Sequence, residues 1–201
     1  AAAVLTGILG ANALSGSSLD ADGILRLATM IEGHPDNVAP AFSGGLMISV
    51  MEDEAVITRK VDIPEWQVAV VLPDIHLTTE ASRSALPETV SIQDAVFNIG
   101  HAALVIEALR TGDLDLLRSA MQDRIHQPYR LPLITGAKGA LRIAKEIGAA
   151  AALSGAGPSV VAFVEGNVGE VACAMKQAFL QKGILARMFM LRTLNDGAKV
   201  L

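Results

Sequence analysis

Apolar runs of strand length alternate with helical patterns over the second part of the chain, and this alternation restricts the possible folds most. Residues 66–72 and 160–164 are short and almost wholly apolar, as is typical of buried strands. Residues 91–110 and 168–181 instead repeat apolar side chains at helical spacing, and residues 185–191 form a last strand-like run. We therefore expect an α+β sandwich, with helices packed on one face of a largely antiparallel sheet.

Turn and capping residues predict the remaining elements. Residues 2–13 and 23–31 are expected to be helical, with Asp20 or Asp22 capping the second helix, and residues 46–51 and 55–61 are expected to form a hairpin. Pro64 marks a boundary that predicts two domains, residues 1–63 and 64–201. Beyond it, shorter helices are expected over residues 78–86, 114–121 and 133–147.

Composition argues against several classes of function. Hydrophobic residues make up 51% of the 201 residues and charged residues only 18%, which predicts an ordered interior. The net charge of −5 offers no basic surface for nucleic acid, and no uncharged apolar run approaches the length that a bilayer requires. The single cysteine, Cys173, lies in a periodic apolar stretch, so we expect it to be a small buried side chain. A lone cysteine fits a cytoplasmic protein.

Polar side chains are concentrated in residues 32–37, which read Glu-Gly-His-Pro-Asp-Asn. Four functional side chains on a stretch broken by glycine and proline could converge on one ligand. An ordinary polar loop between a helix and a strand is the alternative, and spacing alone favours that alternative.

A glycine-rich segment, Ser-Gly-Ala-Gly-Pro-Ser, occupies residues 154–159. Glycines allow backbone amides to approach an anion closely, so a phosphate-binding loop is one interpretation and a tight turn before a strand is the other. The segment lacks the Gly-Lys-Ser/Thr ending of a Walker loop. Arg83 and Arg130 also stand beside helix-breaking residues, and arginine binds carboxylate or phosphate through its planar fork.

Together these segments resemble the homoserine kinases, members of the GHMP kinase superfamily. Residues 32–40, Glu-Gly-His-Pro-Asp-Asn-Val-Ala-Pro, followed by Gly44 and Gly45, resemble the second motif of homoserine kinases. Residues 154–159 resemble the third, glycine-rich motif of the superfamily, and the resemblance spans essentially the whole chain. It implies the remainder of a ribosomal-protein-S5-like N-terminal, ATP-binding domain in residues 1–63, and a ferredoxin-like GHMP kinase C-terminal domain in residues 64–201.

The first motif of this family, Pro-x-x-x-Gly-Leu-Gly-Ser-Ser-Ala-Ala, is not found in the sequence. Residues 1–3, Ala-Ala-Ala, resemble the start of the helix that follows this ATP-phosphate loop. We therefore interpret the chain as a fragment that lacks the N-terminal segment, and we expect the fragment alone to bind ATP weakly.

The resemblance implies transfer of the γ-phosphoryl group of ATP to the side-chain hydroxyl of L-homoserine, a step of threonine biosynthesis, with Mg²⁺ bridging the phosphates. It implies that His34, Asp36 and Asn37 line the acceptor pocket. Asp36 is the candidate to accept the hydroxyl proton, and alignment of the reactants without a dedicated base is the alternative.

The resemblance also implies roles for the other polar segments. Arg83 and Arg130, assisted by Thr79, would hold the homoserine carboxylate or the transferring phosphate. With Asp36 and Asn37, these two arginines are the expected catalytic residues. The expected phosphate loop consists of Ser154, Gly155, Ala156, Gly157 and Ser159, and Glu32 is the candidate Mg²⁺ ligand.

Two other functions remain open from the sequence. One is another GHMP kinase, acting on mevalonate or a sugar, and the other is a non-catalytic relative that binds a metabolite. The histidine at position 34 and the spacing of Thr79 and Arg83 favour an amino-acid acceptor. The expected partners are small molecules, without nucleic acid or membrane, and a homodimer is expected by analogy. His101 is expected to be either packed or exposed without a role in the site, and Asp123 and Arg124 are expected to form a solvated ion pair.

Overall fold

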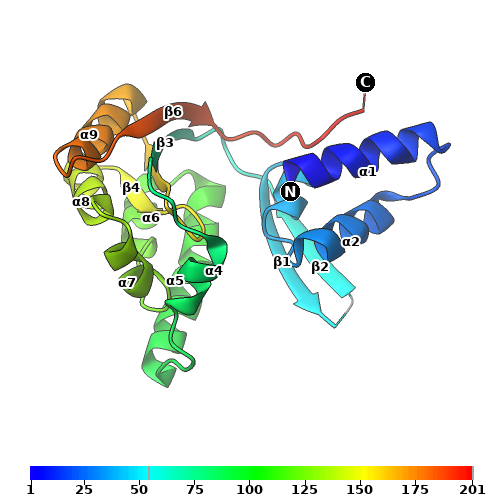
Figure 1. Ribbon diagram of the computed structural model, residues 1–201, viewed down its shortest axis with the longest axis horizontal. Coiled ribbons are helices and arrows are strands. Elements are labelled where there is room, and N and C mark those ends of the chain that lie inside the picture. Colours follow the sequence, from blue (N-terminus) through cyan, green and yellow to red (C-terminus); the bar gives the residue numbers. More distant parts are fainter. Residues whose placement is uncertain (54, 201) are drawn as a thin grey trace. The chain divides into compact units, whose positions relative to one another are not determined.

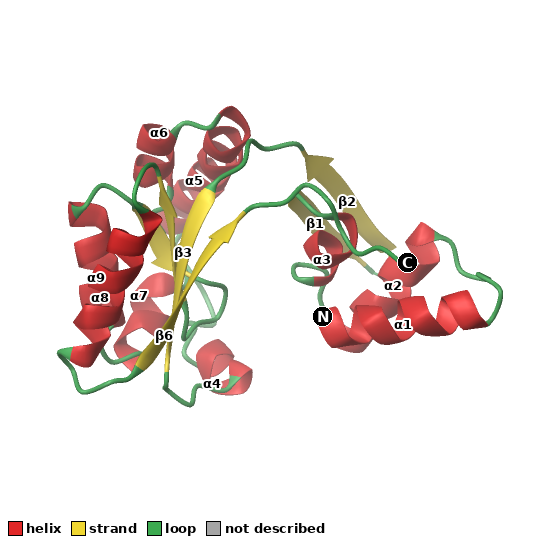
Figure 2. Cartoon of the chain, turned by 90° about the horizontal axis from the view of Figure 1, so that it is seen from above, coloured by secondary structure: helices red, strands yellow, loops and turns green. Residues whose placement is uncertain are grey.

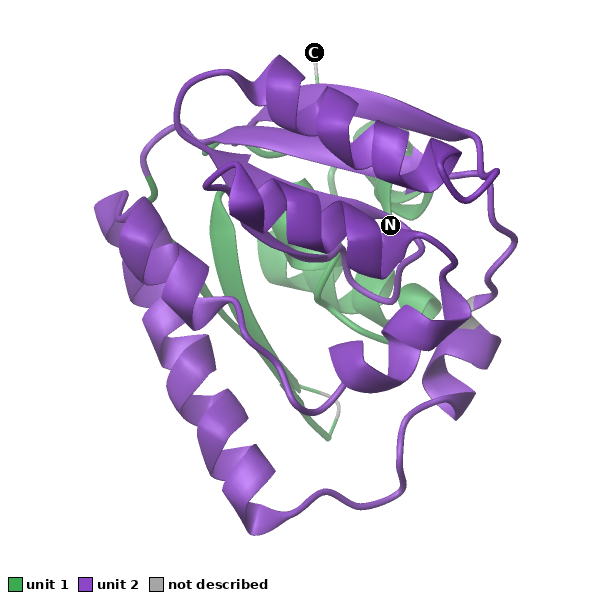
Figure 3. Ribbon diagram, turned by 90° about the vertical axis from the view of Figure 1, so that its left-hand side faces the viewer, with its two compact units in different colours: residues 1–63, 194–201 green, residues 64–193 purple. Residues whose placement is uncertain are grey.

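The computed structural model describes residues 1–53 and 55–200, except for the side chain of Thr79 (Figure 1). The chain divides into two compact units, coloured separately in Figure 3. Unit 1 comprises Ala1–Ile63 and Leu194–Leu201, and unit 2 comprises Pro64–Thr193. The C-terminal tail, which we expected in the second domain, therefore groups with unit 1.

Unit 1 consists of helices packed beside a hairpin. Its elements are α1 (Ala2–Leu14), α2 (Ala21–Glu32), α3 (Val38–Ser43), β1 (Leu46–Glu52) and β2 (Ala55–Val61). The strands β1 and β2 are antiparallel. Leu46 pairs with Val61 at one end of the hairpin and Glu52 pairs with Ala55 at the other. Asp20 caps α2, as one of the two expected alternatives, by accepting a hydrogen bond from the amide of Gly23 at 2.8 Å. The hairpin was expected from the sequence, but α3 was not.

The two glycines that follow α3 allow the C-terminal tail to pass close by. Gly44 and Gly45 both have φ near +71°, a region that a side chain disfavours. The amide of Gly45 donates to the carbonyl of Leu194 at 2.8 Å, and a Cβ on Gly44 would lie 2.5 Å from the carbonyl oxygen of Asn195. Lys60 Nζ donates to the carbonyl of Ser43 at 2.9 Å on the same side. This glycine pair is therefore explained by the packing of the tail within unit 1.

Unit 2 is built on a four-stranded antiparallel sheet, as the sequence predicts. Its strands are β3 (Gln67–Pro73), β4 (Ala150–Leu153), β5 (Val160–Val164) and β6 (Ala186–Arg192), in the spatial order β4-β5-β3-β6. In the register, Ala69 pairs with Ala162 on one side and with Met190 on the other. The strand β4 lies at one edge of this sheet.

Two helices, α8 (Ala137–Glu146) and α9 (Val168–Leu180), cover one face of the sheet (Figure 2). Buried side chains from both helices meet the inward residues of the strands, among them Ala140, Met175, Phe179, Val71 and Val160. Small alanines let the helices approach the sheet closely, which agrees with the alanine-rich sequence. This packing confirms the α+β arrangement.

The remaining helices of unit 2 precede β4 in the chain. They are α4 (Thr79–Ser84), α5 (Ile92–Thr111), α6 (Leu114–Ala120) and α7 (Gln127–Arg130), which continues into the 3₁₀ turn η1 (Leu131–Leu133). Ser91 and Asp113 cap α5 and α6 through side-chain oxygens. The sequence predicted a helix over residues 133–147; the structure begins it only at Ala137, after Gly136 with φ +93°.

The helix α5 is long and apolar enough, by length and composition alone, to cross a membrane. Such a single helix is a weak indication, and Asp94, Glu107 and Arg110 interrupt its apolar surface. Its C-terminal turn packs into unit 2, where the indole nitrogen of Trp66 donates to the carbonyl of Leu109 at 3.1 Å.

The expected burial of Cys173 was wrong. Its side chain is exposed, with its sulfur 3.9 Å from that of Met188.

Candidate active site

The polar motif of unit 1 lies between the end of α2 and the start of α3. Gly33 ends α2 in the left-handed conformation, with φ +83°, and its amide donates to the carbonyl of Thr29 at 2.8 Å. Asn37 then stands at the N-terminal end of α3. The short connection between the two helices brings the polar residues of the motif together.

His34, Asp36 and Asn37 form one polar cluster in unit 1. Asp36 Oδ1 accepts a hydrogen bond from the amide of Asn37 at 2.9 Å and lies against His34 Nδ1. The histidine nitrogen touches this oxygen, but the two are not aligned as a hydrogen bond. The Asp36 side chain is 71% exposed, so the cluster combines an accessible carboxylate with an imidazole and an amide. Such a set suits recognition of a small polar molecule.

Glu32, the predicted magnesium ligand, lies at the end of α2. Its Oε1 is 2.9 Å from the backbone nitrogen of Ala1. In residues 1–53 and 55–200, no group of three or more histidine, cysteine, aspartate or glutamate side chains is arranged to hold a metal ion. The role of Glu32 as a magnesium ligand stays a prediction.

The glycine-rich loop of unit 2 joins β4 to β5. The amide of Ser154 donates to the carbonyl of Ser159 at 2.9 Å, and the amide of Gly157 donates to the carbonyl of Ser154 at 3.0 Å. Gly155 and Gly157 have φ of +57° and +83°. A Cβ on Gly157 would lie 2.7 Å from Cδ1 of the buried Ile134, so this position requires glycine for packing as well as for its backbone.

The tip of this loop is open. A Cβ on Gly155 would meet no atom within 4 Å, and in the described part of the structure the amides of Gly155 and Ala156 donate to no protein group. Free amides on an accessible glycine backbone suit a negatively charged oxygen. The loop therefore fits a phosphate group of ATP by its chemistry.

Arg130, on α7, lies beside the loop through Ser82 of α4. Arg130 Nε donates to the carbonyl of Ser82 at 3.2 Å, and Ser82 Oγ donates to the carbonyl of Ala156 at 2.7 Å. Arg83 follows Ser82 in the chain, and its side chain is exposed. The structure thus brings Arg130 and the loop together, with α4 between them. The side chain of Thr79 lies outside the described part of the structure.

Asp123 organises the segment that carries Arg130. Its carboxylate is only 8% exposed and accepts hydrogen bonds from Asn98 Nδ2 at 2.6 Å and from the amides of residues 125–127. The expected solvated pair with Arg124 is therefore wrong. Arg124 instead lies 3.5 Å from Asp94 and 3.8 Å above the ring of Phe97. Asp123 thus holds the turn that leads into α7 through the backbone amides of that turn.

Burial, hydrogen bonds and neighbouring charges shift the pKa values of two residues near Arg130. Burial acts to raise the pKa of Asp123, but the hydrogen bonds from Asn98 and the backbone outweigh it, so this pKa lies below its ordinary value. The pKa of His126 is lowered, first by burial and then by the positive charge of Arg130, while Asp123 opposes the shift. His126 Nδ1 lies 3.4 Å from Arg130 Nη1, and its neutral form avoids a repulsive second charge there.

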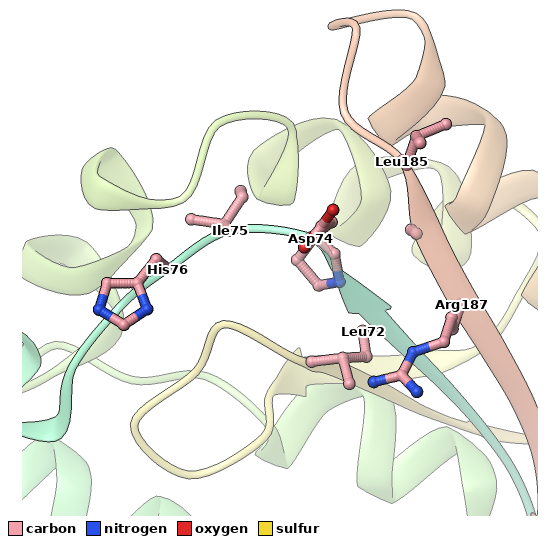
Figure 4. Close-up of a pocket in the computed structure, with 8 residues that line it drawn as sticks. Leu72, Asp74, Ile75, His76, Leu185 and Arg187 are labelled. Atoms are coloured by element: carbon pink, nitrogen blue, oxygen red, sulfur yellow. The ribbon is translucent and has the colours of Figure 1, made fainter.

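Unit 2 also contains pockets. The larger, of about 500 Å³, lies where β3 ends and β6 begins and is lined by Asp74, His76 and Arg187 among apolar residues (Figure 4). None of the predicted site residues lines it. A pocket of about 350 Å³ between α5 and α6 is lined by residues that include Asn98, Asp123, His126 and Gln127. Because it adjoins the hydrogen-bonded network of Arg130, we consider this second pocket the more relevant to the chemistry.

Sequence reasoning missed Ser82, Asp123 and Gln127. Gln127 Oε1 accepts from the amide of Leu153 at 3.0 Å, directly before the glycine-rich loop. Asp123 had no capping signal in the sequence, because it precedes α7 by several residues and His126 holds the N-cap position. Ser82 had no such signal either. His101, for which packing and exposure were both open, stacks on Phe97 with ring centroids 3.7 Å apart.

Comparison with known proteins first defines the class. Residues 105–181 match the family model described as GHMP kinases C terminal. The chain is also similar over 90–98% of its length to the solved structures of a Streptococcus pneumoniae phosphomevalonate kinase (TM-score 0.67, 13% identity) and an L. major mevalonate kinase (TM-score 0.68, 16% identity). It covers 65% and 67% of those two chains, and at these identities the likeness concerns the fold alone. Unit 2 therefore has the fold of a GHMP kinase C-terminal domain.

Curated relatives then define the family within this class. The chain is 46% identical to a homoserine kinase of Moorella thermoacetica over its full length and 69% of the relative, and 40% identical to one of Desulfitobacterium hafniense over its full length and 68% of the relative. A crystal structure of homoserine kinase from Cytophaga hutchinsonii matches with a TM-score of 0.90 at 26% identity, covering 98% of this chain and 65% of that one. The chain belongs to the homoserine kinase family and spans about two thirds of the length of these relatives.

Proposed function

We propose that the protein containing this chain transfers the γ-phosphoryl group of ATP to the side-chain hydroxyl of L-homoserine, giving O-phospho-L-homoserine. The observation that carries the proposal is the contact network in unit 2, in which Arg130 lies beside a glycine-rich loop with free amides. The identity of the acceptor, homoserine, is inferred from the relatives, which are named homoserine kinases. Use of the product in threonine biosynthesis and a cytoplasmic location are part of the proposal.

The reaction forms a bond between the homoserine hydroxyl oxygen and the γ-phosphorus and breaks the bond from that phosphorus to ADP. Its main requirements are alignment of the reactants and neutralisation of negative charge. The free amides of Gly155 and Ala156 would bind phosphate oxygens. Magnesium neutralises phosphate charge when it is bound, and Glu32 is the ligand that we propose for it.

Arg130 and Arg83 would hold anionic groups of the substrates. A guanidinium matches a carboxylate or a phosphate with two parallel hydrogen bonds, and Arg130 retains its Nη atoms for such a pair because Nε is already bound to Ser82. We propose Thr79 as an additional contact of homoserine. The α-carboxylate of homoserine is thus distinguished from the uncharged groups of a sugar.

In unit 1, His34 and Asn37 would orient the polar groups of the amino acid. Asp36, exposed and in contact with His34, is the candidate to take up the hydroxyl proton as the new bond forms. Alignment alone remains the competing explanation of the rate. The homodimer stays a prediction.

Analysis of the reaction product tests this function. The protein, expressed from its complete coding sequence, is incubated with ATP, Mg²⁺ and L-homoserine, and the mixture is followed by ³¹P NMR. We expect a phosphomonoester signal that appears in proportion to ADP and is absent without homoserine. Inorganic phosphate in place of the phosphoester would show ATP hydrolysis and contradict the proposal. No turnover would favour a non-catalytic metabolite-binding protein.

A further inference from the structure

Ser82 occupies a unique place in the described part of unit 2, because its two polar groups face two different parts of the candidate site. Its hydroxyl donates to the carbonyl of Ala156 in the glycine-rich loop at 2.7 Å. Its carbonyl accepts from Arg130 Nε at 3.2 Å. The side chain of Arg130 and the backbone of the loop are therefore both hydrogen-bonded to Ser82.

Burial makes both of these contacts effective. Ser82 is 1% exposed, one of the few buried polar residues of the described chain, so water does not compete for its hydroxyl. A hydrogen bond in such a place is costly to lose, because the acceptor remains without a partner. The neighbouring residues of α4 on either side, Ala81 and Arg83, are exposed.

The space that Ser82 fills does not by itself explain the hydroxyl. Serine is a small polar residue, and an alanine of nearly equal volume would fill the same space without needing a hydrogen-bond partner. The hydroxyl instead donates to the carbonyl of Ala156, in the Ala156–Gly157 peptide group. This peptide group directly follows the one that carries the free Ala156 amide, and its orientation depends on Ser82.

We propose that Ser82 is a positioning residue, which holds the Ala156–Gly157 peptide, next to the free amides of the glycine-rich loop, in a fixed relation to Arg130. This inference rests on the proposed function and names a residue that supports it without touching either substrate. Loss of the hydroxyl would leave the loop peptide free to rotate and would loosen the alignment between Arg130 and a phosphate bound at the loop. Small losses of alignment cost large factors in rate.

A double-mutant cycle tests the coupling. In the protein expressed from its complete coding sequence, we expect Ser82→Ala to lower kcat/KM for homoserine at least tenfold while leaving the thermal midpoint within a few degrees. In an Arg130→Ala background, the same change should lower kcat/KM less than threefold, because the aligned partner is already gone. The matched control is Ser84→Ala, an exposed serine on the same helix, which should change neither quantity. Equal factors in both backgrounds would overturn the coupling.

Amide hydrogen exchange provides a measurement that does not depend on enzymatic activity. The amide of Gly157 is bonded to the carbonyl of Ser154 within the loop, and Ser82→Ala should speed its exchange at least tenfold, while Ser84→Ala should not. Unchanged exchange would overturn the proposal even if the wild-type protein proved inactive on homoserine. Fast exchange together with an inactive wild-type protein would retain the positioning of the loop by Ser82 and refute only the proposed function.

Discussion

The side chain of Gln127 accepts a hydrogen bond from the backbone amide of Leu153 at 3.0 Å and so joins α7 to the last residue of β4. The strand β4 is at the edge of its sheet, where amides facing outward have no neighbouring strand. Leu153 is 5% exposed, so its amide needs a protein partner. Gln127 provides it directly before the glycine-rich loop.

We predict that Gln127→Ala leaves this amide unpaired and destabilises unit 2 by about 1–3 kcal/mol, the usual cost of an unsatisfied buried donor. Native-state hydrogen exchange of the Leu153 amide measures this directly, and the exchange should become much faster. Gln177→Ala, on the exposed side of α9, is the control and should leave the amide protected. Equal protection in both variants would show that Gln127 does not hold the edge of the sheet.

Replacement of Arg130 should affect the acceptor more than the nucleotide. We predict that Arg130→Ala lowers kcat/KM for homoserine about a hundredfold, equivalent to about 2.7 kcal/mol of transition-state stabilisation, and leaves nucleotide binding near normal. Steady-state kinetics and calorimetry with a non-hydrolysable ATP analogue separate the two effects. Arg142→Ala removes an exposed arginine that pairs with Glu146 on α8 and serves as the control. Unchanged homoserine kinetics would exclude Arg130 from the site.

Asp123 should make stability depend on pH in the acidic range. Its pKa in the folded protein lies below the unfolded value of about 3.9, so its carboxylate stabilises the fold above that pH, and the contribution disappears as pH falls through the folded pKa. We predict that Asp123→Asn lowers stability at pH 7 by about 1.5–3 kcal/mol and that the difference from wild type shrinks towards pH 3. Thermal midpoints measured from pH 3 to 7 check this, with Asp115→Asn, an 86% exposed side chain, as the control. A constant difference would contradict the assignment.

The pKa of His126 depends on the charges of its neighbours. Because burial and Arg130 lower its pKa while Asp123 raises it, we predict that Arg130→Ala raises the pKa of His126 and that Asp123→Asn lowers it further. NMR titration of the imidazole measures both shifts in the folded protein. Shifts of the same sign in the two variants would contradict the arrangement of charges.

The two glycines of the loop should respond differently to alanine. Gly157→Ala combines the strain of φ +83° with a Cβ 2.7 Å from Ile134, and we predict a loss of stability of about 2–5 kcal/mol. Gly155→Ala meets no atom within 4 Å and should cost only about 1–2 kcal/mol of backbone strain, yet it should weaken binding of an ATP analogue because the backbone is no longer open to a phosphate. Thermal midpoints and calorimetry separate the two effects. Unaltered nucleotide binding by Gly155→Ala would contradict the role of the loop.

Periodicity was sufficient to predict most of the fold. The strands around Val71 and Val160 and the helices α5 and α9 lie within a few residues of their expected positions, because their apolar spacing follows directly from the faces that they bury. The short helices α3 and α7 escaped prediction, since helices of six and four residues carry too little periodicity to stand out. Their positions depend on contacts distant in sequence.

The sequence motifs predicted the residues of the candidate site. The hydrogen bonds that hold these residues in place were missed, because they join residues distant in sequence. His34 and Asp36 are close in sequence, so their contact is foreseeable. The bonds from Ser82 to Ala156 and from Gln127 to Leu153 join residues 74 and 26 positions apart, and no local pattern indicates them. The wrong expectation for Asp123 has the same origin, because its neighbour in sequence is not its partner in space.

The most direct test of the central claim is ADP release by the protein expressed from its complete coding sequence, with ATP, Mg²⁺ and a panel of acceptors. The panel contains L-homoserine, L-serine, mevalonate and galactose, each at equal concentration. Our account predicts ADP release that depends on L-homoserine and is far slower with the other three. Release that depends instead on mevalonate or galactose would retain the GHMP kinase class and contradict the proposed acceptor.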